Sequence, residues 1–190
     1  MPLTAVRLTL LVLVGSLNSR AVATDVRQVP IAAGWAKTKV NCVIFRRNSL
    51  VSDGTSQFAA YYDGEGRVVL AKRKLGGTDW QIQNTPYRGN VKDAHNCISI
   101  ALDGDGYLHL SWDHHGNPLR YCCSVAPGSL ELTEKMAMVG KKESRVTYPE
   151  FHLLPGGDLL FFYRDGGAGN GDLILNRYDL KQRKMDSPAR

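Results

Sequence analysis

Several signatures are missing from this sequence of 190 residues, and each absence narrows the possible functions. The sequence contains no arginine-rich helix, no RNA-binding signature and no zinc-finger spacing of cysteine and histidine. Since these patterns mark most nucleic-acid-binding proteins, we expect no nucleic-acid partner. An obvious pair of catalytic carboxylates is also missing, so any chemistry must be sought in other residue types.

No apolar run at the N-terminus is long enough to span a bilayer comfortably. Arg7 precedes the short run Leu8–Val14, and Ala21–Ala23 supplies a small-x-small cleavage site. These parts predict a secretory signal peptide over residues 1–23 and a secreted domain over 24–190, outside the cell or in the periplasm and without a membrane contact. The alternatives are a buried N-terminal core strand or a short anchor.

Four cysteines would suit disulfides in a secreted protein, yet their positions argue against a simple pair. Cys97 and Cys122 are expected two strands apart, roughly 9–10 Å, which is beyond the reach of a disulfide. The neighbours Cys122 and Cys123 should point to opposite faces of their strand. We therefore expect small core residues at these positions, and Cys42 is left open.

The composition is ordinary for a globular protein, with 43% hydrophobic and 22% charged residues. Cleavage after Ala23 would remove Arg7 and Arg20 and no acid, which lowers the formal charge from +6 to +4. A modest positive charge on a secreted protein indicates an acidic glycan as partner rather than nucleic acid. No oligomeric state is predicted.

Nineteen glycines, eight prolines and short apolar runs favour an all-β fold. Glycine-rich turns at 63–66, 103–106 and 155–157 start 40 and then 52 residues apart. Strand, turn, strand and strand at such a period predicts β-propeller blades, with a β-sandwich as the alternative. The blades are expected near residues 55–85, 95–140 and 146–180.

Three blades do not close a propeller ring, which needs four to eight. We therefore expect an incomplete set of about three blades from the N-terminal portion of a longer propeller. The alternative is that the polar stretch Lys181–Lys184 is simply a solvated end.

Hairpin pairing in the second repeat brings histidines from two strands together. If Leu102 faces Tyr107 across the turn, then His95 falls opposite His114, with His115 just beyond.

In the third repeat the same reasoning, with Leu154 and Asp158 flanking the turn, places Tyr148 opposite Arg164. Equivalent positions of adjacent blades share one face, so these groups should converge on one rim. The first repeat should add Thr55, Lys72 and Lys74 at that rim.

Imidazole, phenol and guanidinium together suit β-elimination from a uronate sugar. Arg164 would neutralise the carboxylate in the transition state, while histidine and tyrosine serve as base and acid. Each residue also has a structural reading, such as a packing role for Tyr148 or an ion pair of Arg164 with Asp165. Asp113 could orient an imidazole. The histidines could instead begin a metal site, but no third ligand is evident, so we expect no metal and no cofactor.

Three stretches carry a resemblance to a known family: KDAHNCISIALDGDGYLHLSWDHHGNPLRY, VTYPEF and FFYRDGGAGNGDLILNRY. With the earlier GTSQFAAYYDGEGRVVLAKRKL, they resemble the BNR-repeat propeller proteins that include ulvan lyases, over roughly residues 35 to 180. The resemblance implies a seven-bladed propeller that cleaves a sulfated algal polysaccharide by β-elimination. It also implies catalytic roles for His95, His115, Tyr148 and Arg164. Candidate substrate-binding residues are His114, Lys72, Lys74 and Arg88.

The leading hypothesis is a secreted polysaccharide lyase that acts on a uronate-containing, sulfated glycan. One rival is a sialidase-like hydrolase, which is weakened because the sequence has no Ser-x-Asp-x-Gly-x-x-Trp box and no clear arginine triad. The other rival is a non-catalytic, glycan-binding propeller fragment.

Overall fold

A computed structural model describes residues 26–35, 38 and 48–187 of the chain. The predicted signal peptide over 1–23 and Cys42 lie outside the described residues. Within them the chain forms twelve β-strands, all paired antiparallel, which agrees with the expected all-β class. In the same described part, no helix is long and apolar enough to cross a membrane.

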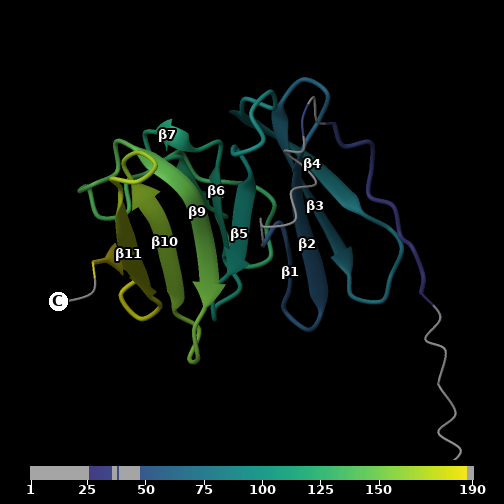
Figure 1. The fold of residues 1–190 in the computed structure, drawn as a ribbon. Coiled ribbons are helices and arrows are strands. Elements are labelled where there is room, and N and C mark those ends of the chain that lie inside the picture. Colours follow the sequence, from purple (N-terminus) through teal and green to yellow (C-terminus); the bar gives the residue numbers. More distant parts are fainter. Residues whose placement is uncertain (1–25, 36–37, 39–47, 188–190) are drawn as a thin grey trace, which may run out of the picture.

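The strands form three sheets that follow one another along the chain, except that β7 joins the third sheet before β8 completes the second (Figure 1). The first sheet has the order β1 (Leu50–Ser52), β2 (Ser56–Tyr62), β3 (Arg67–Lys74), β4 (Gln81–Arg88). The second has the order β5 (Ile98–Leu102), β6 (Leu108–Trp112), β8 (Tyr121–Cys123). The third has the order β12 (Lys184–Asp186), β11 (Asp172–Asp179), β10 (Leu159–Asp165), β9 (Val146–Leu153), β7 (His115–Asn117).

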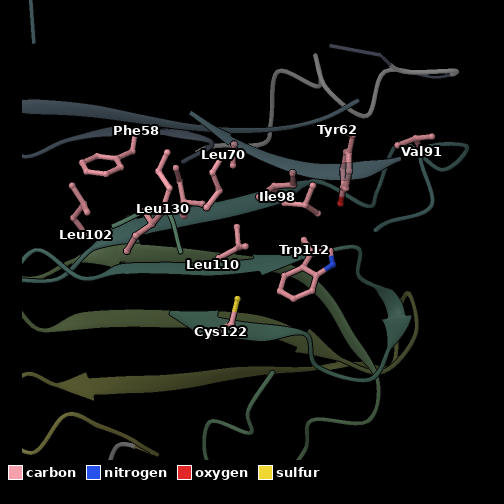
Figure 2. Packing of buried hydrophobic residues seen from close by; sticks show 14 residues of the cluster. Phe58, Tyr62, Leu70, Val91, Ile98, Leu102, Leu110, Trp112, Cys122 and Leu130 are labelled. Carbon is pink, nitrogen blue, oxygen red and sulfur yellow. The ribbon is translucent and has the colours of Figure 1, made fainter. Parts of the chain in front are cut away.

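The second sheet is buried on both faces because it is sandwiched between the other two. Ile100, Leu110 and Trp112 face the first sheet, where they join a cluster that includes Phe58 and Leu70 (Figure 2). Ala101, with Tyr121 of β8, joins a separate cluster against Phe151 and Phe161 of the third sheet. Each fully buried large side chain stabilises the fold by roughly 1.5–3 kcal/mol. Two-sided burial explains why β5 and β6 consist of buried residues throughout.

The three described cysteines are free thiols, as their positions predicted. Cys97 and Cys122 are buried, and burial raises the pKa of Cys122 to about 12. Both act as small core residues.

The strands and turns of the first repeat correspond to those of the other two repeats in a different way than the turn pattern predicted. The innermost strand of the first sheet is β1, which contacts β5 of the next sheet. The turn at Asp53-Gly54 therefore corresponds to the turns that start at Asp103 and Pro155, spaced 50 and then 52 residues apart. The expectation of a first repeat centred on the turn at 63–66 is wrong, because the three-residue β1 carries too little pattern to be recognised.

In this correspondence, the lysines of β3 lie at the end of the first sheet that is opposite to His95. The Lys72 ammonium donates to the Gly128 carbonyl (2.6 Å), and the Gly128 N–H donates to the carbonyl of Gly106 in the β5–β6 turn. At the other end, the Tyr62 hydroxyl donates to the Asn96 carbonyl (2.7 Å), next to His95. The expectation that Thr55, Lys72 and Lys74 share the rim of His95 is therefore wrong.

The β5–β6 register differs from the expected one by a single residue. Leu102 pairs with Leu108 rather than with Tyr107, because Asp103 stays in the ladder and the loop has only three residues. Gly106 ends that loop at φ 84°, a left-handed conformation that suits glycine. A slip of one residue reverses every side chain of a strand. The ladder ends at Ile98 and Trp112, and beyond it the ring of His115, not that of His114, stacks on the ring of His95.

The side chain of His114 is fully buried. Its Nε2 accepts a hydrogen bond from the Arg120 backbone N–H (2.8 Å). Burial, assisted by the charge of Arg120, lowers the pKa of His114 to about 3. The imidazole is therefore neutral in the folded chain at pH values where it is charged in the unfolded chain.

This difference predicts acid sensitivity. Below the unfolded pKa near 6.5 the unfolded chain binds an extra proton, so the free energy of unfolding should fall as the pH drops toward 3, by up to about 1.4 kcal/mol per pH unit. In His114→Gln this dependence should flatten by that amount, as measured by urea denaturation between pH 7 and 4. His152→Gln, which removes a half-exposed imidazole, is the control. Equal slopes for His114→Gln and the unmutated chain would contradict the assignment.

The turns of the second and third sheets touch through glycine. The Gly104 N–H donates to the Gly157 carbonyl (2.9 Å), and a Cβ on Gly157 would lie 2.6 Å from the Gly104 Cα. Gly156 has a similar φ, 92° against 95°, but a Cβ there would meet nothing within 4 Å.

Gly157→Ala should therefore destabilise the chain more than Gly156→Ala. Both substitutions carry the strain of a positive φ, about 1–2 kcal/mol, but only the first forces the two turns apart, at a further cost of about 1–3 kcal/mol. Thermal unfolding of the two variants measures the difference. Identical melting temperatures would show that the contact between the turns is dispensable.

Candidate active site

Three of the predicted catalytic side chains lie together at one end of the second and third sheets. His95 lies in the loop before β5, His115 begins β7, and Tyr148 lies on β9. The two imidazole rings stack with their centroids 4.1 Å apart. The Tyr148 ring lies 5.8 Å from the His95 ring and 6.5 Å from the His115 ring. We call this group, with Arg164, the rim cluster.

A carboxylate that the sequence reasoning missed holds the two imidazoles. Asp93 Oδ1 lies 2.5 Å from His95 Nδ1, and Oδ2 lies 2.6 Å from His115 Nδ1. The His95 backbone N–H also donates to Oδ1 (3.0 Å). Burial raises the pKa of Asp93, but these hydrogen bonds outweigh it and lower the pKa to about 2. The spacing Asp-x-His in the loop was the signal that could have revealed Asp93.

Asp113, the carboxylate expected to orient an imidazole, has other partners. Its Oδ1 accepts the Asn90 backbone N–H (2.8 Å), and its Oδ2 lies 3.4 Å from the Arg120 guanidinium. Burial raises the pKa of Asp113, partly offset by these two partners. The expectation of a role for Asp113 at the histidines is wrong, because its carboxylate bonds to Asn90 and Arg120 instead.

Tyr148 reaches the rim cluster through a β-bulge. The β9–β10 register runs as expected as far as Glu150, which pairs with Phe162, and then shifts so that Thr147 faces Arg164. Tyr148 takes φ 56°, a left-handed conformation that is rare for an aromatic residue and costs about 1–3 kcal/mol. Such bulges re-aim side chains next to active sites. Strain of this kind points to function.

Arg164 lies beside Tyr148, close to its expected place. Its guanidinium carbon lies 5.0 Å from the centre of the Tyr148 ring, and its Nε donates to the Gly166 carbonyl (3.2 Å). Gly171 makes room for this side chain, since a Cβ there would come 2.7 Å from Arg164 Cγ. The half-buried arginine thus places a fixed positive charge next to a phenol.

The strand β7 ties the two halves of the site together. It leaves the second sheet after β6 but pairs with β9 of the third, so that His115 faces Thr147 (Figure 1). The Gly116 N–H donates to the Thr147 hydroxyl (2.7 Å), and the His115 N–H donates to the Asn117 side-chain oxygen (2.9 Å). Strand pairing therefore holds His115 opposite Thr147, the residue next to Tyr148.

The structure does not bring the predicted substrate-binding residues into the rim cluster. His114 is buried, and Lys72 and Lys74 lie at the opposite end of the first sheet. Arg88 lies at the correct end, where its carbonyl accepts the Trp112 indole N–H (3.2 Å), but its guanidinium pairs with Glu65 (3.2 Å).

Asp93 is the third ligand that a metal site with His95 and His115 would need. The donor atoms of the three residues lie within 4.8 Å of one another. However, tetrahedral zinc with bonds of 2.0–2.2 Å keeps its donors roughly 3.3 Å apart. The oxygen–nitrogen distances of 2.5 and 2.6 Å are those of short hydrogen bonds. The geometry therefore fits a hydrogen-bonded triad better than a metal centre.

The rim cluster can carry out proton transfer beside a bound anion. Two imidazoles and a phenol supply groups that accept and donate protons, and Arg164 supplies the charge that binds a carboxylate. Within the described residues Asp93 is the carboxylate that contacts the imidazoles, and it is committed to both of them. This arrangement lacks the paired carboxylates of most glycoside hydrolases.

Comparison with solved structures identifies the fold. The chain is similar to the polysaccharide lyase Uly1, with a TM-score of 0.68 and 19% identity over 86% of this chain and 44% of that one. It is also similar to a PL25 ulvan lyase bound to -[GlcA(1-4)Rha3S]-, with a TM-score of 0.59 and 17% identity over 74% of this chain and 36% of that one. The three sheets are thus blades of an incomplete β-propeller, as predicted.

Sequence comparison gives the same relationship. The chain is 27% identical over 181 residues to the long isoform of ulvan lyase from Alteromonas sp. This match covers 68% of this chain and 18% of that protein. It is 26% identical over 148 residues to the short isoform from Alteromonas sp. (strain LOR), covering 54% and 28% respectively. The chain thus spans less than a third of these relatives. The model of the BNR repeat-containing family matches residues 56–190, and the chain belongs to that family.

Proposed function

We propose that the chain is part of a secreted polysaccharide lyase that cleaves a uronate-containing, sulfated glycan by β-elimination. The observation that carries the proposal is the rim cluster, in which two imidazoles, a phenol and a guanidinium are assembled across two blades. The ulvan lyase relatives, and the neighbour bound to a disaccharide of glucuronate and sulfated rhamnose, support the substrate class.

Arg164 is proposed to bind the uronate carboxylate. In β-elimination the C5–H bond and the glycosidic C4–O bond break, and a C4–C5 double bond forms. Negative charge builds up on the carboxylate as the proton leaves, and a fixed guanidinium stabilises that charge. The contacts of Arg164 with Gly166 and the Tyr148 ring hold its charge next to the proton-transfer groups.

His95 and Tyr148 are proposed to share the roles of base and acid. One removes the C5 proton, and the other protonates the leaving glycosidic oxygen. His115, stacked on His95, assists. Each imidazole has its Nδ1 turned to Asp93, so Nε2, on the far edge of the ring, is the atom that meets substrate.

Export remains part of the proposal, through a signal peptide over residues 1–23. Expression of the full chain in a secreting host, followed by N-terminal sequencing of the exported protein, tests it. A mature N-terminus at Thr24 is expected. Retention of Met1 would overturn this part of the proposal.

Incubation with ulvan should produce the ultraviolet absorbance of an unsaturated uronate. Tyr148→Phe and His95→Ala should each lower the rate by about 10²-fold or more, since each removes a proton-transfer group. Tyr107→Phe is a matched control, because the Tyr107 ring also lies 5.0 Å from an arginine, Arg183, but in the turn at the opposite end of the sheet. Full activity of the double variant Tyr148→Phe, His95→Ala would contradict the assignment.

The same incubation separates the rival functions. New reducing ends without ultraviolet absorbance would indicate a hydrolase. Binding of the glycan without turnover would indicate a non-catalytic propeller fragment.

Arg164→Ala should lower kcat/KM on ulvan by about 10²-fold or more, because it removes the charge that neutralises the uronate carboxylate. Arg164→Lys should recover part of the loss, since it restores the charge but not the planar geometry. Arg177→Ala on neighbouring β11 removes an exposed arginine that pairs with Asp158, and it should leave the rate unchanged. An esterified uronate should show little difference between Arg164→Ala and the unmutated chain, and an equal loss on both substrates would speak against carboxylate binding.

A further inference from the structure

Asp93 occupies a position that links both imidazoles of the rim cluster to one carboxylate. Its two oxygens are divided between the rings, Oδ1 to His95 Nδ1 and Oδ2 to His115 Nδ1. Its side chain is 29% exposed, less than the 40% of each histidine, so it lies behind the rings. The catalytic roles proposed above assign no proton transfer or substrate contact to it.

We propose that Asp93 is a positioning residue that sets the tautomer and the ring orientation of both His95 and His115. A carboxylate with a low pKa is an acceptor only, so each Nδ1 that faces it must carry a hydrogen. In a neutral imidazole the lone pair then lies on Nε2, at the far edge of the ring. One side chain thus presents two basic Nε2 atoms to the same space.

The loop around Asp93 is built to keep the carboxylate in place. Its Oδ1 also accepts the His95 backbone N–H (3.0 Å), and its carbonyl accepts the Asn96 N–H (3.2 Å). The turn over Asp93–Asn96 therefore ties the position of the carboxylate to that of the first imidazole. The second imidazole is held independently by the pairing of β7 with β9.

Asp93→Asn tests the proposal directly because it replaces one carboxylate oxygen, an acceptor, with an NH₂ group, a donor. The asparagine oxygen can still accept from the His95 backbone and ring, but its NH₂ group then faces His115. An imidazole opposite an NH₂ donor must present a lone pair at Nδ1, which moves its hydrogen to Nε2. The atom that faces substrate would change from acceptor to donor.

Histidine-selective ¹⁵N NMR of the full chain reads the tautomers directly. In the unmutated chain, His95 and His115 should both show the Nδ1–H form, with the signals assigned by their loss in His95→Gln and His115→Gln. In Asp93→Asn at least one of the two should shift to the Nε2–H form. Asp53→Asn is the matched control, because Asp53 also caps a turn through backbone N–H groups, at the opposite end of the first sheet.

Either of two NMR results would overturn the proposal. The first is an Nε2–H tautomer at His95 or His115 in the unmutated chain, which needs no variant to fold. The second is a folded Asp93→Asn in which both tautomers remain unchanged.

The catalytic consequence rests on the proposed lyase function and is measured separately. On ulvan, Asp93→Asn should lower kcat by about 10²-fold or more, as expected when a catalytic imidazole is held in the wrong tautomer, with KM changed by less than about threefold. Absence of turnover by the unmutated chain would refute the function and leave the NMR result to decide on Asp93. Turnover by the unmutated chain with an unchanged kcat in Asp93→Asn would overturn the inference alone.

Discussion

The pairing of β7 with β9 is the constraint on which the rest of the site depends. Each blade of a propeller is a separate sheet, and side-chain packing holds most of the contact with its neighbours. Here a segment of the second blade crosses over and joins the ladder of the third, so that His115 faces Thr147, the neighbour of Tyr148. Contact of the Gly104 and Gly157 turns holds the opposite end. The two blades are thereby kept in register at both ends, which a site divided between them requires.

The packed core tolerates the strain that the site introduces. Tyr148 is held at a positive φ by a bulge in β9, while Phe151 and Phe161 bury the same hairpin a few residues away. Burial of two aromatic rings is worth more than the cost of one left-handed residue. The result is a rigid support behind a rim whose imidazoles, phenol and guanidinium come from the ends of strands and from loops. Asp93 belongs to this support as much as to the site.

Much of this arrangement could be predicted from the sequence, and the errors have a common cause. The β9–β10 register was correct as far as Glu150, because a tight glycine turn and alternating apolar residues specify it. The predicted β5–β6 register was wrong by one residue, because Asp103 remains in the ladder. The predicted correspondence between the first repeat and the other two was wrong because β1 has only three residues. As a result, Lys72 and Lys74 were predicted at the wrong end of the sheet. Local pattern predicts which segments pair, but not the hydrogen bond that ends a turn.

The sequence by itself determined the all-β class, the repeated blades and the residue types of the site, since these follow from periodicity, turn residues and side-chain chemistry. Only the tertiary structure decided that the rings of His95 and His115 stack, that Asp93 bonds to both, and that Tyr148 turns toward them through a bulge. Those outcomes depend on contacts between segments that are distant in sequence, such as β7 with β9, and no local preference encodes them. His95 and His115 thus contact a carboxylate in the loop before β5 and lie beside a phenol on the next blade.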